Sequence, residues 1–116
     1  MEKNPKKTLK KNISFEKSTF SEDKFPDLLK VDLHMHTSDD KRDNINYSSK
    51  DLVDEMHKNK FDVIAFTFHD YAFTDKKIFD YAKNKGILMI PGIEKKVENK
   101  EVLIYAKTTN IIKKTS

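Results

Sequence analysis

The apolar positions of the chain form short runs separated by polar segments, and each run is typical of a β-strand. Residues 29–37 predict a first strand that leads into a polar loop. Residues 61–67 are an almost continuous run of apolar, β-branched and aromatic side chains, which predicts a second strand buried on both faces. Residues 87–90 predict a third strand, which a Pro-Gly pair ends, and residues 102–106 predict a fourth after a turn at 98–100.

The segment between the first two predicted strands carries the signals of a helix. Its apolar side chains fall on one helical face: Leu52, Val53 and Met56. Ser48 or Ser49 is expected to cap the N-terminus, and Asp51, which lies close behind Ser48, makes a loose capping box. We expect this helix to end near Asn59.

A second helix is expected between the second and third strands. Its inner face consists of Ile78, Phe79 and Ala82. Thr74 is expected to cap its start, and Gly86 its end, because glycine readily adopts a left-handed conformation. The alternation of strands and helices predicts an α/β fold with parallel β/α units. Right-handed crossovers would bring the C-terminal ends of the strands to one side, where such folds carry their chemistry.

Composition narrows the kinds of site that the chain can hold. The 116 residues have the size of one domain and include no cysteine, so a disulfide, a thiolate ligand and a cysteine nucleophile are excluded. A metal site must use His, Asp and Glu side chains, which suit Zn, Mn, Fe or Mg. No apolar stretch approaches the ~18 residues of a membrane span, and no secretory signal is recognisable, so we expect a cytoplasmic protein without a membrane partner.

The net charge of +4 is concentrated at the two ends of the chain. Residues 1–25 are expected to form a disordered or loosely ordered basic leader, residues 26–106 the folded domain, and residues 107–116 a basic C-terminal tail. Such ends could bind a nucleic-acid backbone. The basic side chains are almost all lysine, however, whereas bidentate recognition of phosphates and bases favours arginine.

Two histidines at alternate positions of the first strand form the sharpest local feature. In Asp32-Leu33-His34-Met35-His36, the imidazoles of His34 and His36 project to the same face, about 6.6 Å apart along the strand. They could bind one metal ion or two neighbouring ions. Asp32 shares this face, where it either orients an imidazole as a hydrogen-bond acceptor or is simply a polar residue near the start of the strand.

Further polar side chains follow the next two predicted strands. His69 comes directly after the second strand, and Glu94 comes just after the third. Each alone could be an ordinary loop or surface residue. A His or carboxylate at the end of three successive strands is, however, what a metal site at one end of a parallel sheet requires. The remaining histidine, His57, lies among Lys and Asn on the first helix and is expected to be a solvated surface residue.

Three segments, in order, resemble the motifs of polymerase and histidinol phosphatase (PHP) domains. Residues 32–37 (Asp-Leu-His-Met-His-Thr) resemble the first motif, and residues 61–70 the second, an apolar strand that runs into Thr-x-His-Asp. Residues 90–94 resemble the third, which ends in Pro-Gly-x-Glu, and residues 100–105 resemble the strand after it. The resemblance covers roughly residues 30–106.

The resemblance implies part of a distorted (β/α)7 PHP-type barrel with two or three divalent metal ions (Zn, Mn, Fe or Mg) at the top of a complete site. It implies a phosphoesterase that acts on a small phosphate ester or nucleotide, as histidinol phosphatases do, and a likeness to the PHP domains of bacterial replicative DNA polymerases. His34 and His36 would be the metal ligands of the first motif and His69 that of the second. Glu94 would bridge the ions, and these four residues would form the catalytic centre.

The resemblance also implies an aspartate ligand in the loop after the first motif. Asp39, Asp40 and Asp43 compete for this role. Asp43 fits the family's spacing before the first helix best, and Asp40 is the second choice. The surplus carboxylates would then only solvate the loop.

The chain departs from the family pattern at three places. Phe68 stands where many members have Asp, and Glu101 stands where a histidine ligand is expected. Glutamate binds hard metal ions, so Glu101 is either a substitute ligand or the mark of a lost one. The sequence ends at Ser116, before the later strands and their Asp-x-His ligands. An open half-barrel exposes unpaired edges, so we expect a fragment, an oligomer, or a decayed or misassigned reading frame.

The expected reaction is attack of a metal-bound hydroxide on a phosphate ester, in line with the leaving alkoxide. Lys41 and Arg42 either clamp the substrate phosphate or form a solvated basic pair. The alternatives to an active enzyme are an inactive or incomplete PHP metal-binding module and a nucleic-acid-associated accessory protein. Amidohydrolase barrels also begin with His-x-His, but the Pro-Gly-x-Glu segment favours the phosphoesterase.

Overall fold

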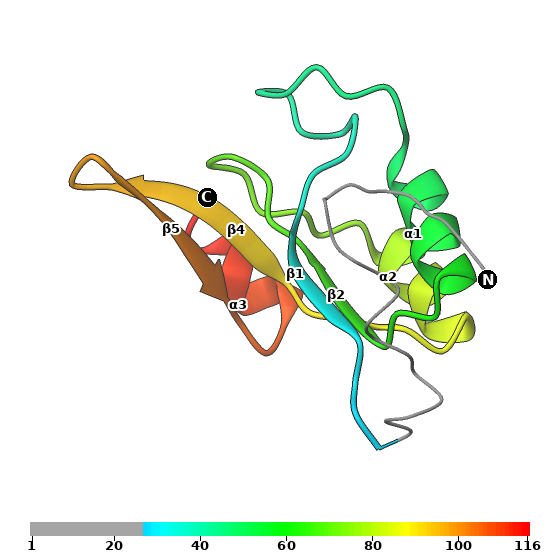
Figure 1. The fold of residues 1–116 in the computed structure, drawn as a ribbon. Helices are drawn as coiled ribbons and strands as arrows, with labels where there is room; N and C mark the ends of the chain where they lie inside the picture. Colours follow the sequence, from blue (N-terminus) through cyan, green and yellow to red (C-terminus); the bar gives the residue numbers. More distant parts are fainter. Residues whose placement is uncertain (1–26) are drawn as a thin grey trace.

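The computed structural model describes residues 27–116, so the expected leader at residues 1–25 lies outside the described part of the chain. In chain order the elements are β1 (Val31–Met35), α1 (Ser49–Lys58), β2 (Val63–Phe66), α2 (Lys76–Asn84), β3 (Leu88–Met89), β4 (Gly92–Val97), β5 (Lys100–Tyr105) and α3 (Thr109–Lys113). Figure 1 shows α1 and α2 on one side of β1 and β2, and the hairpin of β4 and β5 on the other.

The strands β1, β2 and β3 form a parallel sheet with β2 in the centre. Val31 pairs with Val63, which pairs in turn with Leu88. The predicted α/β class with parallel strands is therefore confirmed for this part of the chain. The strands are shorter than predicted, and β3 is an edge strand whose Leu88 is 61% exposed rather than buried.

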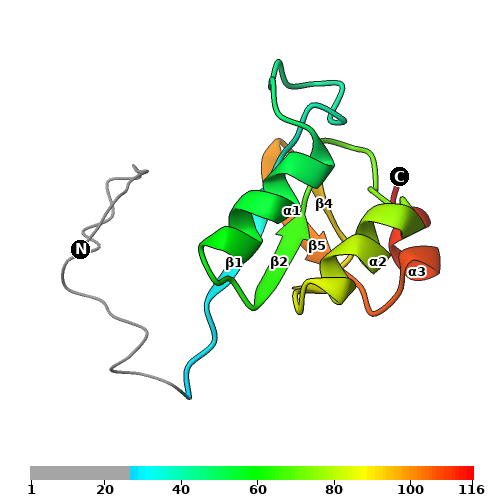
Figure 2. The same ribbon diagram turned by 90° about the vertical axis from the view of Figure 1, so that its right-hand side faces the viewer.

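Helices α1 and α2 cover one face of the parallel sheet (Figure 2). Val53 of α1 and Ala82 of α2 are fully buried and join a core that includes Ile64 and Phe66 of β2. The ring of Phe66 stacks on Phe68, with 5.8 Å between the ring centroids. Full burial of one such side chain contributes about 1.5–3 kcal/mol. This core fixes the sheet against the helices and so sets where the strands end.

The start of α1 follows the prediction, whereas that of α2 does not. Ser48 is the N-cap of α1 and forms a capping box with Asp51. The predicted cap Thr74 is wrong, because Asp75 caps α2 and its carboxylate accepts the N–H of Lys77 at 3.0 Å. An aspartate is the stronger cap, and its negative charge also suits the N-terminus of a helix.

The end of α2 is set by Gly86, as predicted. Gly86 follows the C-cap residue Lys85 and has a φ of 81°. Its N–H donates to the carbonyl oxygen of Lys83, and the N–H of Ile87 donates to that of Ala82, both at 2.9 Å. This pair of bonds is a Schellman motif, which satisfies the last carbonyls of the helix and turns the chain into β3.

The antiparallel pairing of β4 with β5 was not predicted. Only the turn and the second strand of this hairpin were expected. Glu98 and Asn99 form its two-residue loop and have φ values of 50° and 65°, which match the twist of a tight hairpin. The segment Gly92–Val97 carries a run of charged side chains at its centre, so it lacks the hydrophobic alternation that signals a strand.

A second, smaller core lies between the hairpin and α3. It consists of Ala72, Ile93 and Ile112, with Ile104 and Ala106 packed against it. Helix α3, which lies within the basic residues 107–116, therefore covers the face of the hairpin that carries Ile93. The opposite face of the hairpin carries Glu94 and is turned toward the histidines at the ends of the parallel strands.

Within residues 27–116, no helix is long and apolar enough to cross a membrane.

Candidate metal centre

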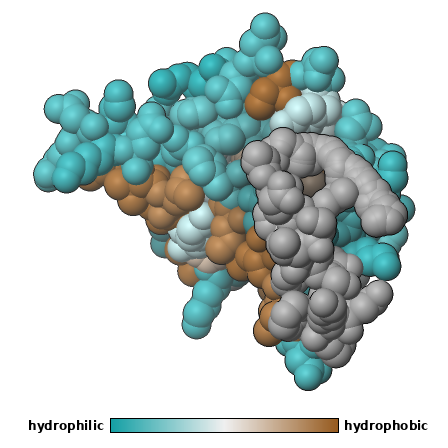
Figure 3. Space-filling view, viewed as in Figure 1, coloured by the Kyte–Doolittle hydropathy of each residue, from teal (hydrophilic) through white to brown (hydrophobic). Residues whose placement is uncertain are grey.

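The loops that follow β1 and β2 lie at one edge of the molecule (Figure 1). His34 lies within β1, His36 directly follows it, and His69 follows β2. The structure brings these three histidines together. The ring centroid of His36 lies 5.3 Å from that of His34 and 4.7 Å from that of His69. Figure 3 shows a mostly hydrophilic surface around these loops, with apolar patches lower on the same face.

Glu94 reaches the histidines by a route that differs from the prediction. It lies inside β4 rather than in a loop after β3. It pairs with His69 in an isolated parallel bridge, in which its N–H donates to the carbonyl oxygen of Phe68 at 2.9 Å. Its own carbonyl oxygen accepts the N–H of Asp70 at 2.8 Å. This bridge fixes β4 beside the end of β2 and places Glu94 in the site.

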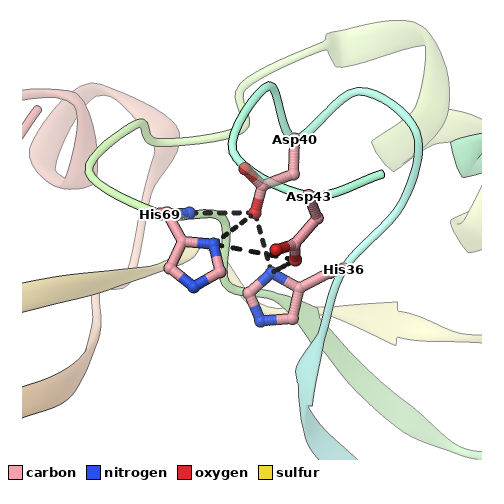
Figure 4. A group of neighbouring side chains, drawn as sticks. All are labelled: His36, Asp40, Asp43 and His69. Carbon is pink, nitrogen blue, oxygen red and sulfur yellow. Dashed lines mark hydrogen bonds and ion pairs between the residues drawn. The ribbon is translucent and has the colours of Figure 1, made fainter. Parts of the chain in front are cut away.

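Asp40 joins the loop after β1 to the loop after β2. Its side chain is only 1% exposed. Its Oδ2 lies 2.8 Å from Nδ1 of His36 and 3.0 Å from Nδ1 of His69, and it accepts the backbone N–H of His69 at 3.0 Å. The other oxygen, Oδ1, accepts the N–H of Arg42 at 3.0 Å. Figure 4 shows the Asp40 carboxylate between the two imidazoles, with Asp43 beside them.

Asp43 supplies a second carboxylate on the same side of the imidazoles. Its Oδ2 lies 3.2 Å from Nδ1 of His36 and 3.7 Å from Nδ1 of His69, and the side chain is 31% exposed. Both predicted aspartate ligands therefore lie beside the histidines, and Asp40 is the more buried and the closer. Asp39 instead accepts a hydrogen bond from the hydroxyl of Ser49 at 2.6 Å.

Glu94 contacts the histidines from the opposite side. Its Oε1 lies 2.9 Å from Nε2 of His34 and 3.1 Å from Nε2 of His36. Its Oε2 lies 3.6 Å from Nε2 of His69. The Glu94 side chain is 7% exposed, whereas that of His34 is 53% exposed. One nearly buried carboxylate is thus shared by three imidazoles, and His34 forms the open side of the site.

The rings of His36 and His69 are stacked with an interplanar angle of 27°. The two Nδ1 atoms therefore lie on one side of the pair of rings, and the two Nε2 atoms lie on the other. Each ring presents Nδ1 to the aspartates and Nε2 to Glu94. A neutral imidazole carries its proton on one nitrogen and a lone pair on the other, and the hydrogen bond at one nitrogen sets which. If Asp40 accepts both Nδ1 protons, both Nε2 lone pairs face Glu94.

The charges around Asp40 favour a positively charged partner. Burial by itself would raise the pKa of Asp40, but hydrogen bonds from the two imidazoles and from backbone N–H groups outweigh it and hold the pKa below its ordinary value. Burial would lower the pKa of His69, but the hydrogen bond to Asp40 and the charges of Asp40, Glu94 and Asp43 raise it above its ordinary value. The same negative field would stabilise a bound cation.

The donor atoms are arranged closely enough to hold metal ions. Three groups of side chains have possible ligand atoms within 4.8 Å of one another: His36, Asp40, Asp43 and His69; His34, His36 and Glu94; and His69, Glu94 and Glu101. Imidazole nitrogens and carboxylate oxygens without sulfur suit Zn, Mn, Fe or Mg. The site therefore fits a divalent metal ion, as the sequence predicted.

Other residues singled out in the sequence have roles outside the ligand set. Phe68 is fully buried, and its ring stacks below that of His36 with centroids 6.4 Å apart. Asp32 accepts the backbone N–H of His34 at 3.1 Å, so its bond is to the chain rather than to an imidazole. His57 is exposed in the last turn of α1 and belongs to none of the ligand groups found among residues 27–116.

A cavity of about 170 Å³ opens beside the histidines. The residues that line it all carry ionisable side chains: Arg42, His69, Asp70, Glu94, Lys95, Lys96 and Glu101. Arg42 donates from its guanidinium to Asp70 at 2.6 Å, which ties the two loops together at the cavity. Asp70 was not a sequence candidate, although it directly follows His69, and its φ of 57° is one that aspartate tolerates better than most residues.

The chain matches no model of a known protein family, and a search of curated proteins found no match to it.

Proposed function

We propose that this chain is a metal-dependent phosphoesterase of the PHP type, or the part of one that carries its metal centre. A single observation carries the proposal. His36 and His69 present one face to Asp40 and Asp43 and the other face to Glu94. Buried carboxylates are rarely gathered without a compensating cation, because each charge costs several kcal/mol to remove from water.

The PHP assignment is supported by the order of the segments and by their placement. His34 lies near the end of the first parallel strand and His36 directly follows it, His69 follows the second strand, and Glu94 comes after the third along the chain, inside β4. We propose that β1, β2 and β3 are the first strands of a PHP-type barrel. Such a barrel carries its chemistry at the C-terminal ends of its strands, and the three histidines lie at the C-terminal ends of β1 and β2.

The Nε2 side of the histidines would hold the metal ions. His34, His36 and Glu94 form one group, and His69 also presents its Nε2 to Glu94, whereas Asp40 and Asp43 lie at the Nδ1 atoms on the other side. Divalent ions bound there would supply a hydroxide nucleophile at neutral pH and neutralise charge that develops on the phosphoryl oxygens. No described side chain needs to act as a covalent nucleophile.

Asp40 would position the imidazoles rather than react. By accepting the Nδ1 protons of His36 and His69, it fixes both tautomers and holds both rings against rotation. A carboxylate behind an imidazole also makes the opposite nitrogen more basic, which strengthens its bond to a metal. The fully buried Phe68 supports the ring of His36 from below.

The cavity beside the centre suits a phosphate group. Its volume of about 170 Å³ is below the 300–1,000 Å³ of pockets that enclose drug-sized ligands. Arg42, Lys95 and Lys96 supply positive charge around it, and Asp70 holds the guanidinium of Arg42 at its edge. A small phosphate ester or a nucleotide phosphate would place its charged end here and leave the rest of the molecule outside.

Metal content and turnover together test this function. The purified chain is expected to contain a divalent metal by elemental analysis and to hydrolyse p-nitrophenyl phosphate when Mn²⁺ is added. His36→Ala is expected to lose both properties. His57→Ala is the matched control, because His57 is exposed on α1 and away from the cluster, and it should retain both.

Two other outcomes would decide against parts of the proposal. A protein that is folded but binds no divalent metal would contradict the metal centre and the phosphoesterase alike. Bound metal without turnover of any phosphate ester would instead indicate an inactive PHP metal-binding module.

A further inference from the structure

The hairpin places Glu101 beside Glu94. In the β4–β5 register, Glu94 pairs with Leu103 and Lys96 pairs with Glu101. Glu101 is therefore two residues from the partner of Glu94 and on the same face of the hairpin, at a diagonal distance that long side chains can span. Oxygen atoms of the two carboxyl groups lie within 4.8 Å of each other.

This contact between two carboxyl groups is unfavourable when both are ionised. A cation held between them would offset this repulsion. His69 lies beside the two glutamates, so that His69, Glu94 and Glu101 offer ligand atoms within 4.8 Å of one another.

Glu94 has an oxygen available on this side. Its Oε1 contacts His34 and His36 at 2.9 and 3.1 Å, whereas Oε2 lies toward His69 at 3.6 Å. The carboxylate can therefore bridge a cation on the His34 side and another on the Glu101 side. The cavity of about 170 Å³ is lined by His69, Glu94 and Glu101, so a hydrated ion can enter the second position from solvent.

We propose that Glu101 is a metal ligand that completes a second cation position with Glu94 and His69, and that this position favours Zn²⁺ over Mn²⁺ or Mg²⁺ less strongly than the neighbouring group does. This inference rests on the proposed metal centre. The position offers two carboxylates and one imidazole, whereas the neighbouring group of His34, His36 and Glu94 offers two imidazoles and one carboxylate. Carboxylate ligands suit Mn²⁺ and Mg²⁺, and imidazole suits Zn²⁺, so the two positions differ in preference.

Equilibrium binding of Mn²⁺ and Zn²⁺ tests this assignment without any measurement of activity. Free Mn²⁺ is followed by electron paramagnetic resonance during titration of the full chain, and Zn²⁺ by competition with a chromophoric chelator. Glu101→Gln is expected to weaken Mn²⁺ binding at one position by about tenfold or more. Glu101→His is expected to raise the ratio of Zn²⁺ to Mn²⁺ affinity at that position by about tenfold.

The control variant is Glu98→Gln, in the loop of the same hairpin, which should bind both metals as the parent chain does. Glu101 is exposed, so its variants should fold, and circular dichroism checks this. Unchanged Mn²⁺ affinity and stoichiometry in Glu101→Gln, with binding lost in His36→Ala, would overturn the role of Glu101 and leave the proposed centre standing. A parent chain that binds neither metal would overturn both.

Discussion

Asp40 and His69 are 29 residues apart in the chain and are joined at a single oxygen atom. Oδ2 of Asp40 accepts the backbone N–H of His69 at 3.0 Å and lies 3.0 Å from the Nδ1 of the same residue. The carboxylate therefore fixes both the main chain and the ring of His69. Because it also contacts Nδ1 of His36, it sets the mutual position of two proposed metal ligands.

Asp40→Asn is expected to weaken metal binding by about 10–100-fold, because an amide accepts hydrogen bonds through one oxygen only and lacks the negative charge of a carboxylate. Isothermal titration with Mn²⁺ measures the change in affinity. Asp39→Asn is the matched control and should bind Mn²⁺ as the parent chain does, because Asp39 lies in the same loop and bonds to Ser49 instead. Equal losses in the two variants would show that the loop, and not the carboxylate of Asp40, is responsible.

His34→Ala is expected to abolish hydrolysis of an aryl phosphate and to remove at least one bound metal ion per chain. The side chain is 53% exposed and contacts Glu94, so its removal should leave the fold intact. Elemental analysis and a thermal melt, made on the same sample, separate loss of metal from loss of structure. Unchanged metal content in this variant would count against the proposed centre.

Phe68→Ala is expected to lower the free energy of unfolding by about 3–5 kcal/mol. The side chain is fully buried, and its ring contacts those of Phe66 and Phe73 with centroids 5.8 and 5.2 Å away. Urea denaturation measures the loss. Tyr71→Ala is the control, because Tyr71 is 54% exposed, and it should change the stability by less than about 0.5 kcal/mol.

The contact between Tyr81 and Asp54 should make the packing of α2 on α1 depend on pH. The Tyr81 hydroxyl donates to Asp54, and this bond, with the charge of Lys50, holds the pKa of Asp54 below its ordinary value. A lowered folded-state pKa contributes stability that is present above the unfolded-state pKa and is lost as the pH falls through the folded-state pKa.

Tyr81→Phe should therefore be less stable than the parent chain at neutral pH and closer to it in acid, at a pH below the ordinary pKa of aspartate. Chemical denaturation at both pH values measures the difference. Lys83→Met, a change at an exposed position of the same helix, serves as the control and should show no such convergence. A difference between Tyr81→Phe and the parent that is the same at both pH values would contradict the role of ionised Asp54.

The sequence by itself determined the local elements of the fold. Strand and helix periods placed β1, α1, β2 and α2, and local capping chemistry placed Ser48 at the start of α1 and Gly86 after the end of α2. These features depend on neighbouring residues, so they can be inferred from the order of residues alone. The alternation of strands and helices also predicted that His36 and His69 would meet at one end of a parallel sheet.

The tertiary structure alone decided how the carboxylates join the histidines. The charged segment Gly92–Val97 is a strand because it pairs with β5 and, at Glu94, with His69. His69 is distant in the chain, and the hydrophobic pattern of the segment does not predict either pairing. Spacing favoured Asp43 over Asp40, whereas the fold buries Asp40 against two imidazoles and leaves Asp43 at the rim. Burial and contact between loops depend on how whole elements pack, and no local sequence rule contains that information.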